Sequence, residues 1–211
     1  YVLLGASILW FGWFGFNGGS ALAADDYAIN AMLVTQIAAG TAATVWGIIG
    51  MITTGKISGV GVATGAVAGL VAITPAAGAV NPLGALAIGL GAGVLCYYAV
   101  ELIHKTKMDD ALDVFAVHGI GGIWGCIATG IFAVESIAGV KGLIEGNATQ
   151  VWIQIYTAFG TLAYSFIVSF VILYLLDKIP GLGLRVSENE EDQGLDLATH
   201  GEQANVNDGA N

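Results

Sequence analysis

Long stretches without charge divide the chain. Five of them contain no Asp, Glu, Lys or Arg: residues 1–24, 27–55, 57–100, 114–134 and 146–176. A helix needs about 20 mainly apolar residues to cross a bilayer, and it must pair its own backbone N–H and C=O groups because lipid offers them no partner. The third stretch is long enough for two helices, since Thr74-Pro75 and Asn81-Pro82 favour a turn between them.

The pattern therefore predicts an all-α fold, a polytopic membrane helix bundle. The expected helices cover about residues 3–24, 28–53, 58–77, 82–103, 112–134 and 150–177. They make up a transmembrane domain over residues 1–179, and residues 180–211 form an acidic cytoplasmic tail. Seven acidic residues and no Lys or Arg lie between residues 187 and 211, so we expect this tail to be solvated.

Composition agrees with a membrane protein. The chain is 56% hydrophobic and 10% charged, whereas soluble domains carry about 25% charged residues. Its net charge of −10 comes mostly from the tail, so the acidity says little about ligands of the membrane part, and nucleic acid is not an expected partner. The two cysteines, Cys96 and Cys126, lie inside predicted spans, so we expect no metal or cofactor site. The sequence shows no nucleophile–base pair of the kind that would indicate an enzyme.

The basic residues predict the orientation. Translocation disfavours Lys and Arg in short loops, whereas Asp and Glu count for little. One set of loops and flanks holds five of the six basic residues, namely Lys56, Lys105, Lys107, Lys178 and Arg185. The opposite set holds only Lys141. The sequence thus predicts a multi-pass protein of the cell membrane with both ends of this chain in the cytoplasm.

Glycine is frequent, with 32 residues. Several glycines recur every four residues, as in Gly61/Gly65/Gly69, Gly89/Gly93 and Gly121/Gly125. This spacing lets helix backbones approach closely, and close packing is a main source of helix association in membranes. We interpret most of the glycines as packing residues, because no phosphate-loop or dinucleotide pattern accompanies them.

One histidine lies inside a predicted span. A buried ionisable side chain in lipid usually faces the bundle interior or a polar path, so His118 is a candidate pore residue. The alternative is a packed histidine bonded to a backbone carbonyl. Val114 lies one turn earlier on the same face. Asp113 lies five residues from His118, and we place its carboxylate in the first turn of the helix, in a structural role.

The first span carries a second candidate site. Leu9, Trp13, Phe16 and Ser20 follow 4-3-4 spacing, which aligns them as one stripe on a helix. Aromatic faces and a hydroxyl suit a small cation, through cation–π attraction and a hydrogen bond. An aromatic belt at the membrane interface is the alternative, and it accounts better for Trp10 and Phe14 than for Phe16 and Ser20.

Three motifs together resemble the ammonium transporter (Amt/MEP/Rh) family: LWFGWFGFNGGSALA, DDALDVFAVHGIGGIWGCIATGIFA and the tail pattern GLRV…GLD…HGE. The resemblance covers essentially the whole chain. The family has eleven spans, the first ten forming two inverted five-helix repeats. The resemblance implies that this chain is the second inverted repeat plus the final helix, truncated at its N-terminus.

The resemblance also implies roles for single residues. Phe16 is similar to one of two stacked phenylalanines at the outer mouth of a pore, Ser20 to the hydroxyl of the ammonium-recruiting site, and His118 to one member of a twin-histidine pair. Trp13, Leu9 and Val114 would line the pore or its edge, and Asp113 would act in the structure and in cytoplasmic coupling. The facing pore residues of the family lie on earlier helices.

The expected function is electrogenic ammonium transport. Ammonium, or its analogue methylammonium, would be recruited and deprotonated at the outer mouth, and ammonia would pass the histidines. The resemblance implies a homotrimer in the lipid bilayer, with a PII-type signal protein as a possible cytoplasmic partner.

Two alternatives to this function stay open. One is an ammonium sensor or transceptor, which usually carries an appended signalling domain. The other is an unrelated ion-coupled solute carrier, which would place charged or unwound polar sites at mid-membrane.

Overall fold

The computed structural model describes residues 1–202, and over this range it contains helices and no strands. The long α-helices are α1 (Val2–Gly19), α2 (Asp26–Thr54), α3 (Gly59–Ile73), α4 (Pro82–Ile103), α5 (Ile120–Phe132) and α7 (Ala148–Asp177). The short ones are α6 (Glu135–Ala138) and α8 (Glu188–Gln193). A 3₁₀-helix, η1 (Thr74–Ala76), follows α3, and two π-helices are η2 (Phe115–Gly119) and η3 (Asp196–His200).

Six helical segments in the described residues are long and apolar enough to cross a membrane: residues 2–19, 26–54, 59–76, 82–103, 115–132 and 148–177. The expected all-α membrane bundle is therefore confirmed. The first segment ends at Gly19, five residues before the predicted end, because absence of charge marks apolar sequence and not helix. After Ser20 the chain turns, Leu22 takes a left-handed φ of 58°, and the Asp25 carboxylate caps α2.

The breaks between the other helices follow local chemistry. The predicted turn between the third and fourth spans is present: η1 contains Pro75, and Asn81 caps α4 by accepting a hydrogen bond from Gly84 N, with Pro82 at the first helical position. Gly55 ends α2 with a φ of 73°, a conformation that glycine adopts without steric cost, and Ser58 caps α3.

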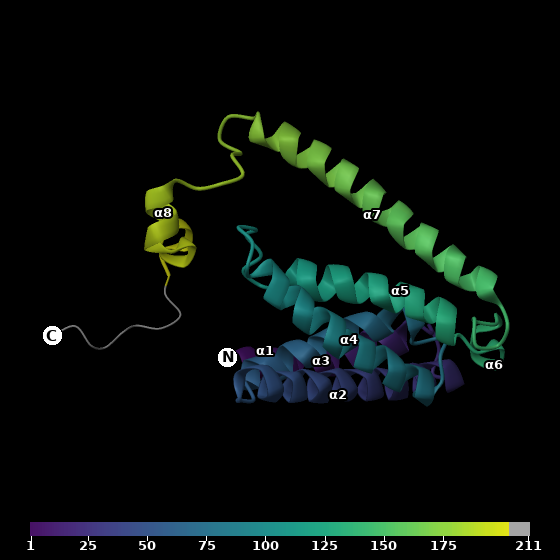
Figure 1. The fold of residues 1–211 in the computed structure, drawn as a ribbon. Coiled ribbons are helices and arrows are strands. Elements are labelled where there is room, and N and C mark those ends of the chain that lie inside the picture. Colours follow the sequence, from purple (N-terminus) through teal and green to yellow (C-terminus); the bar gives the residue numbers. More distant parts are fainter. Residues whose placement is uncertain (203–211) are drawn as a thin grey trace. The chain divides into compact units, whose positions relative to one another are not determined.

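Contacts divide the chain into two compact units, residues 1–159 and residues 160 onward. The boundary falls within α7, and the predicted boundary between residues 179 and 180 remains a prediction. In the first unit α2 packs against α1, α3 and α4, and α5 packs against α3 and α4. Figure 1 shows these helices side by side with alternating direction. The N-terminus and the α4–η2 loop therefore lie at one end of the unit, and α6 at the other.

Glycines set the distance between these helices. A Cβ atom added to Gly69 of α3 or to Gly89 of α4 would meet the backbone oxygen of Ala38 on α2, and one added to Gly125 of α5 would meet that of Ala72 on α3. A Cβ atom added to Gly65 would meet the Cβ of Trp46 on α2. The four-residue glycine spacing is thus confirmed as helix packing, because a backbone oxygen cannot move aside for a side chain.

The second unit contains most of α7 and the described part of the tail. Phe166, Phe170 and Tyr174 stack along α7. In the tail, Ser187 and Glu190 form a capping box at the start of α8, and Arg185 lies 2.7 Å from Glu191. Hydrogen bonds from Ser187 lower the pKa of Glu190, because they favour its charged form. The last nine residues of the predicted tail, 203–211, lie outside the described residues.

Candidate functional site

The predicted stripe on α1 is present on the helix. Leu9, Phe16 and Ser20 are exposed, and Trp13 is half-buried. The rings of Trp13 and Phe16 meet edge to face, with centroids 5.7 Å apart. Trp10, by contrast, has a buried Nε1 with no hydrogen-bond partner among the described residues. Interfacial tryptophans keep this group wet, so the aromatic-belt interpretation does not fit Trp10.

A pocket of about 340 Å³ opens where α1 ends. It gathers residues from α1, from the α1–α2 loop, from the first turns of α2 and from η1 with the residues that follow it. The lining residues are Phe16, Asn17, Ser20, Ala21, Asp25, Tyr27, Ala31, Thr74, Ala77 and Gly78. Two predicted site residues, Phe16 and Ser20, thus lie in one pocket, with a second aromatic ring and a carboxylate beside them.

Hydrogen bonds between helices hold this pocket in shape. Trp13 Nε1 donates to Thr74 Oγ1 at 2.8 Å, which ties α1 to the end of α3. Asn17 Nδ2 donates to Thr35 Oγ1 at 2.8 Å, which ties α1 to α2, and both residues are buried. Because each of these side chains spans two elements, the position of Phe16 and Ser20 is set by buried contacts and not by the exposed loop.

The Ser20 hydroxyl presents acceptors to the pocket. Its Oγ donates its hydrogen to the backbone oxygen of Phe16 at 2.7 Å. The lone pairs of Oγ are left for a donor. An ammonium ion has four N–H donors and no acceptor, so the remaining capacity of Ser20 matches the predicted ligand.

His118 lies on the π-helix η2 and is exposed, as is Val114 just before this helix. Their neighbours Ala116 and Val117 are buried and share an apolar cluster with Trp46, Val71 and other residues of α2, α3 and α4. The His118 side chain makes no hydrogen bond to any described residue, so the packed-histidine alternative has no carbonyl partner among them. The imidazole faces outward from the bundle. Trp13 packs against the same apolar cluster as Val117.

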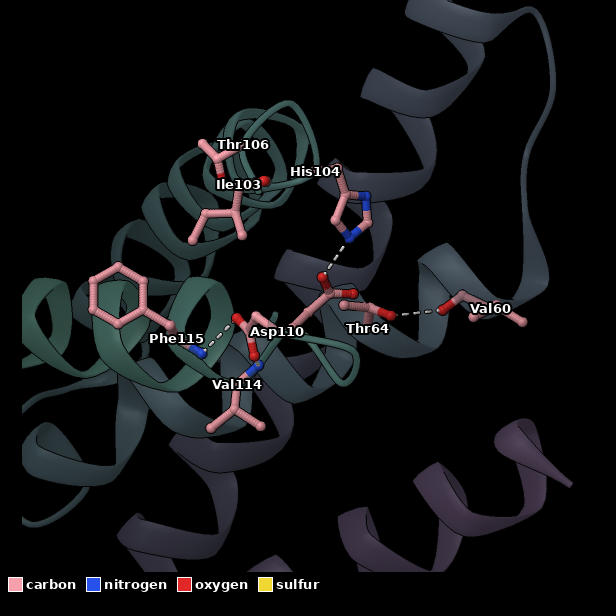
Figure 2. A network of polar contacts seen from close by, with 9 residues as sticks. Val60, Thr64, Ile103, His104, Thr106, Asp110, Val114 and Phe115 are labelled. Carbon is pink, nitrogen blue, oxygen red and sulfur yellow. Dashed lines mark hydrogen bonds and ion pairs between the residues drawn. The ribbon is translucent and has the colours of Figure 1, made fainter. Parts of the chain in front are cut away.

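One carboxylate, that of Asp110, organises the start of η2, and the structure differs from the sequence expectation here. Asp110 accepts hydrogen bonds from Val114 N at 2.8 Å and Phe115 N at 2.9 Å, and Figure 2 shows its carboxylate against these two residues. The Asp113 carboxylate was expected in this first turn. Asp113 instead has a left-handed φ of 54°, and its Oδ1 lies 2.7 Å from Nε2 of His104, just after α4.

Sequence inspection missed several of these residues. Asn17, Asp25, Tyr27 and Thr74 line the pocket although none was singled out, because their proximity depends on how α1, α2 and η1 pack. The π-helix around His118 was not foreseen either, and π-turns inside α-helices are often found at functional sites. The described residues contain no group of three or more His, Cys, Asp or Glu side chains that could hold a metal ion.

Comparisons with known proteins give one consistent result. Residues 1–205 match the sequence family described as the Ammonium Transporter Family. Ammonium transporter Amt1 of Archaeoglobus fulgidus is 50% identical over 202 residues, which cover 96% of this chain and 51% of that protein. The crystal structure of Saccharomyces cerevisiae Mep2 superposes with a TM-score of 0.84 at 38% identity, covering 88% of this chain and 43% of Mep2.

A structure described as a sensor Amt protein is also similar, with a TM-score of 0.83 and 37% identity over 93% of this chain and 48% of that one. This chain spans about half the length of the curated relatives that it matches. Those relatives are named as transporters and not as enzymes.

Proposed function

Because this chain belongs to the ammonium transporter family, we propose that it forms one wall of a pore that carries ammonium across the membrane. The observation that carries this proposal is the pocket at the end of α1, where Phe16 and Ser20 lie together. An aromatic ring and a hydroxyl with free lone pairs suit a small cation better than they suit water, since the ring face attracts positive charge. This pocket is the outer recruiting site.

Recruitment and conduction are separate steps. A dry pore rejects a hydrated ion because desolvation of the charge is costly, whereas neutral ammonia passes. Near Phe16, ammonium therefore passes its proton to water in the pocket, and ammonia continues past Trp13, Leu9 and Val114. His118 then accepts or donates a hydrogen bond to ammonia, and its imidazole relays the proton, so net transport is electrogenic. The exposure of His118 and its lack of a hydrogen-bond partner in the described chain support this role.

The facing wall of the pore belongs to helices outside this chain, and a second histidine there completes the pair with His118. This chain covers about half the length of its curated relatives, which supports this division. Both ends of the chain lie in the cytoplasm, which the placement of five of the six basic residues supports. The homotrimer, the PII-type partner and the role of Asp113 in cytoplasmic coupling remain predictions.

A substitution of His118 tests the proposal. In the intact transporter that contains this chain, His118→Ala should reduce methylammonium-driven current by about tenfold or more, because proton transfer through a positioned imidazole is lost. Current and uptake are measured on proteoliposomes. His104→Gln is the matched control, since His104 lies beyond the end of α4 and glutamine can still donate to Asp113. Unchanged current and selectivity in His118→Ala would refute the role of His118.

The same measurements separate the alternatives. A sensor would bind methylammonium without moving it, so the wild-type protein would show binding and no uptake. An unrelated ion-coupled carrier would place charged or unwound polar sites at mid-membrane. In the described spans the charged residues, Asp26, Glu101 and Asp177, lie near helix ends. The named curated relatives are transporters, so transport is the function that we favour.

A further inference from the structure

The pocket at the end of α1 contains a carboxylate that has no ion-pair partner among the described residues. Asp25 lines this pocket together with Phe16 and Ser20. Its Oδ1 accepts a hydrogen bond from Ala28 N at 3.1 Å and thereby caps α2. Within the described residues its other oxygen, Oδ2, receives no hydrogen bond, and no Lys, Arg or His lies within ion-pair distance of the carboxylate. One full negative charge therefore borders the pocket.

A second acceptor in the pocket follows from the hydrogen bonds of Asn17. Thr35 Oγ1 donates its hydrogen to the backbone oxygen of Ala31, so towards Asn17 it can only accept. The Asn17 amide must therefore turn its Nδ2 to Thr35, as the structure has it. Asn17 Oδ1 is then left as an acceptor with no donor among the described residues. Asn17 is only 5% exposed, and it lines the pocket.

Three acceptors are thus left free in the pocket: Asp25 Oδ2, Asn17 Oδ1 and the lone pairs of Ser20 Oγ. A cavity of this kind favours a donor-rich cation over water or an anion, because water also needs donors to saturate its own lone pairs. Phe16 and Tyr27 add aromatic rings beside these acceptors. The aromatic rings and the hydroxyl bind a cation at contact, whereas the carboxylate also attracts it from a distance.

We infer that Asp25 is the electrostatic part of the recruiting site, which concentrates a monovalent N–H cation in the pocket before its proton is lost. This inference rests on the proposed function of the pocket. It makes Asp25 a recruiting residue that acts on the cation before it enters the pore. Its removal should therefore raise KM and leave kcat unchanged, because the steps inside the pore are not altered.

Asp25→Asn is the decisive variant, because asparagine is as good a helix cap as aspartate and keeps an oxygen for Ala28 N. In the intact transporter in proteoliposomes, we expect KM for methylammonium to rise about three- to fivefold, the range of a solvent-exposed ion pair. Added salt should raise the KM of the wild type and leave that of Asp25→Asn nearly unchanged, since salt screens the charge that the variant lacks. Asp25→Ser gives a second uncharged cap with the same expectation.

Asp26→Asn is the matched control. Asp26 carries the same charge one residue further along α2 but does not line the pocket, so its variant should keep the wild-type KM and salt dependence. A wild-type KM and salt dependence in both Asp25 variants would overturn the inference, and so would an equal loss in Asp26→Asn or a fall in kcat alone. A wild-type protein that moves no methylammonium would instead refute the proposed function, whatever the Asp25 variants do.

Discussion

Two hydroxyl groups, that of the buried Thr35 and that of the half-buried Thr74, act as relays where α1 meets its neighbours. Thr35 Oγ1 accepts from Asn17 of α1 and donates to its own helix at Ala31 O. Thr74 Oγ1 accepts from Trp13 of α1 and donates to Leu70 O. Each hydroxyl uses its single hydrogen locally and its lone pairs across the interface. Thr35 therefore fixes the orientation of the Asn17 amide, and Thr74 fixes that of the Trp13 indole.

Thr35→Val should destabilise the protein by about 1–3 kcal/mol, because the buried Asn17 Nδ2 loses its acceptor while the shape of the side chain is kept. Thermal or denaturant unfolding in detergent measures this change. Thr44→Val is the control: Thr44 is exposed on the same helix and bonds only to Gly40 O, so we expect a change of at most about 0.5 kcal/mol. Equal effects at the two positions would mean that the Asn17–Thr35 bond contributes nothing measurable.

At the scale of the element, the backbone at the start of η2 is held by Asp110 and not by Asp113, the aspartate nearest to the helix in sequence. Asp110 uses one carboxylate oxygen for Val114 N and the other for Phe115 N. Asp113 is excluded from this role by its left-handed backbone, which directs it to His104 instead. Asp110, three residues before Asp113, thus fixes the start of the helix that carries His118.

Substitutions at Asp110 should act in steps. Asp110→Ala removes both acceptors and should speed amide hydrogen exchange at Val114 and Phe115, each by the equivalent of about 1 kcal/mol. Asp110→Asn keeps one acceptor oxygen, so only one of the two amides should lose protection. Exchange read by mass spectrometry or NMR in detergent distinguishes the two patterns. If both variants protect the two amides as the wild type does, the carboxylate does not hold η2.

Close packing of α2 against α3 and α4 makes a second prediction at this scale. Gly69→Ala places a Cβ against the backbone oxygen of Ala38, so the helices must separate, at a cost of about 1–3 kcal/mol. Gly40→Ala, on α2 itself, meets no atom within 4 Å and should be neutral or slightly stabilising, because alanine is the better helix former. Unfolding in detergent compares the pair, and similar stabilities would contradict the packing role of Gly69.

For the molecule as a whole, the distribution of basic residues predicts which ends of the helices face the cytoplasm. In a background without Cys96 and Cys126, Lys141→Cys should react with a membrane-impermeant maleimide in intact cells, whereas Lys56→Cys should react only after permeabilisation. The reason is that short loops rich in Lys or Arg are retained on the cytoplasmic side. The pocket lies at the end of the bundle opposite to the 55–58 loop. The reverse labelling pattern would therefore place the pocket on the cytoplasmic side and contradict recruitment from outside.

The sequence by itself determined the class of fold and the number of spans. Lipid offers no hydrogen-bond partners, so long charge-free stretches must become helices, and prolines and asparagine caps separate them. The four-residue spacing of glycines likewise predicted close helix packing before any contact was known. The stripe of Leu9, Trp13, Phe16 and Ser20 also followed from spacing, because a single helix fixes which of its residues share a face.

Only the tertiary structure decided what faces that stripe. The pocket combines residues from α1, α2 and η1 that are up to 62 positions apart, Phe16 to Gly78, and no periodicity relates them. The free acceptors of Asn17 and Asp25 also depend on contacts, because Thr35 and Ala28 take up the other polar atom of each side chain. The structure likewise decided that Asp110, and not Asp113, holds the start of η2, because the left-handed φ of Asp113 turns its carboxylate away. Helices form from local hydrogen bonds and sequence spacing, whereas a site forms from contacts between helices.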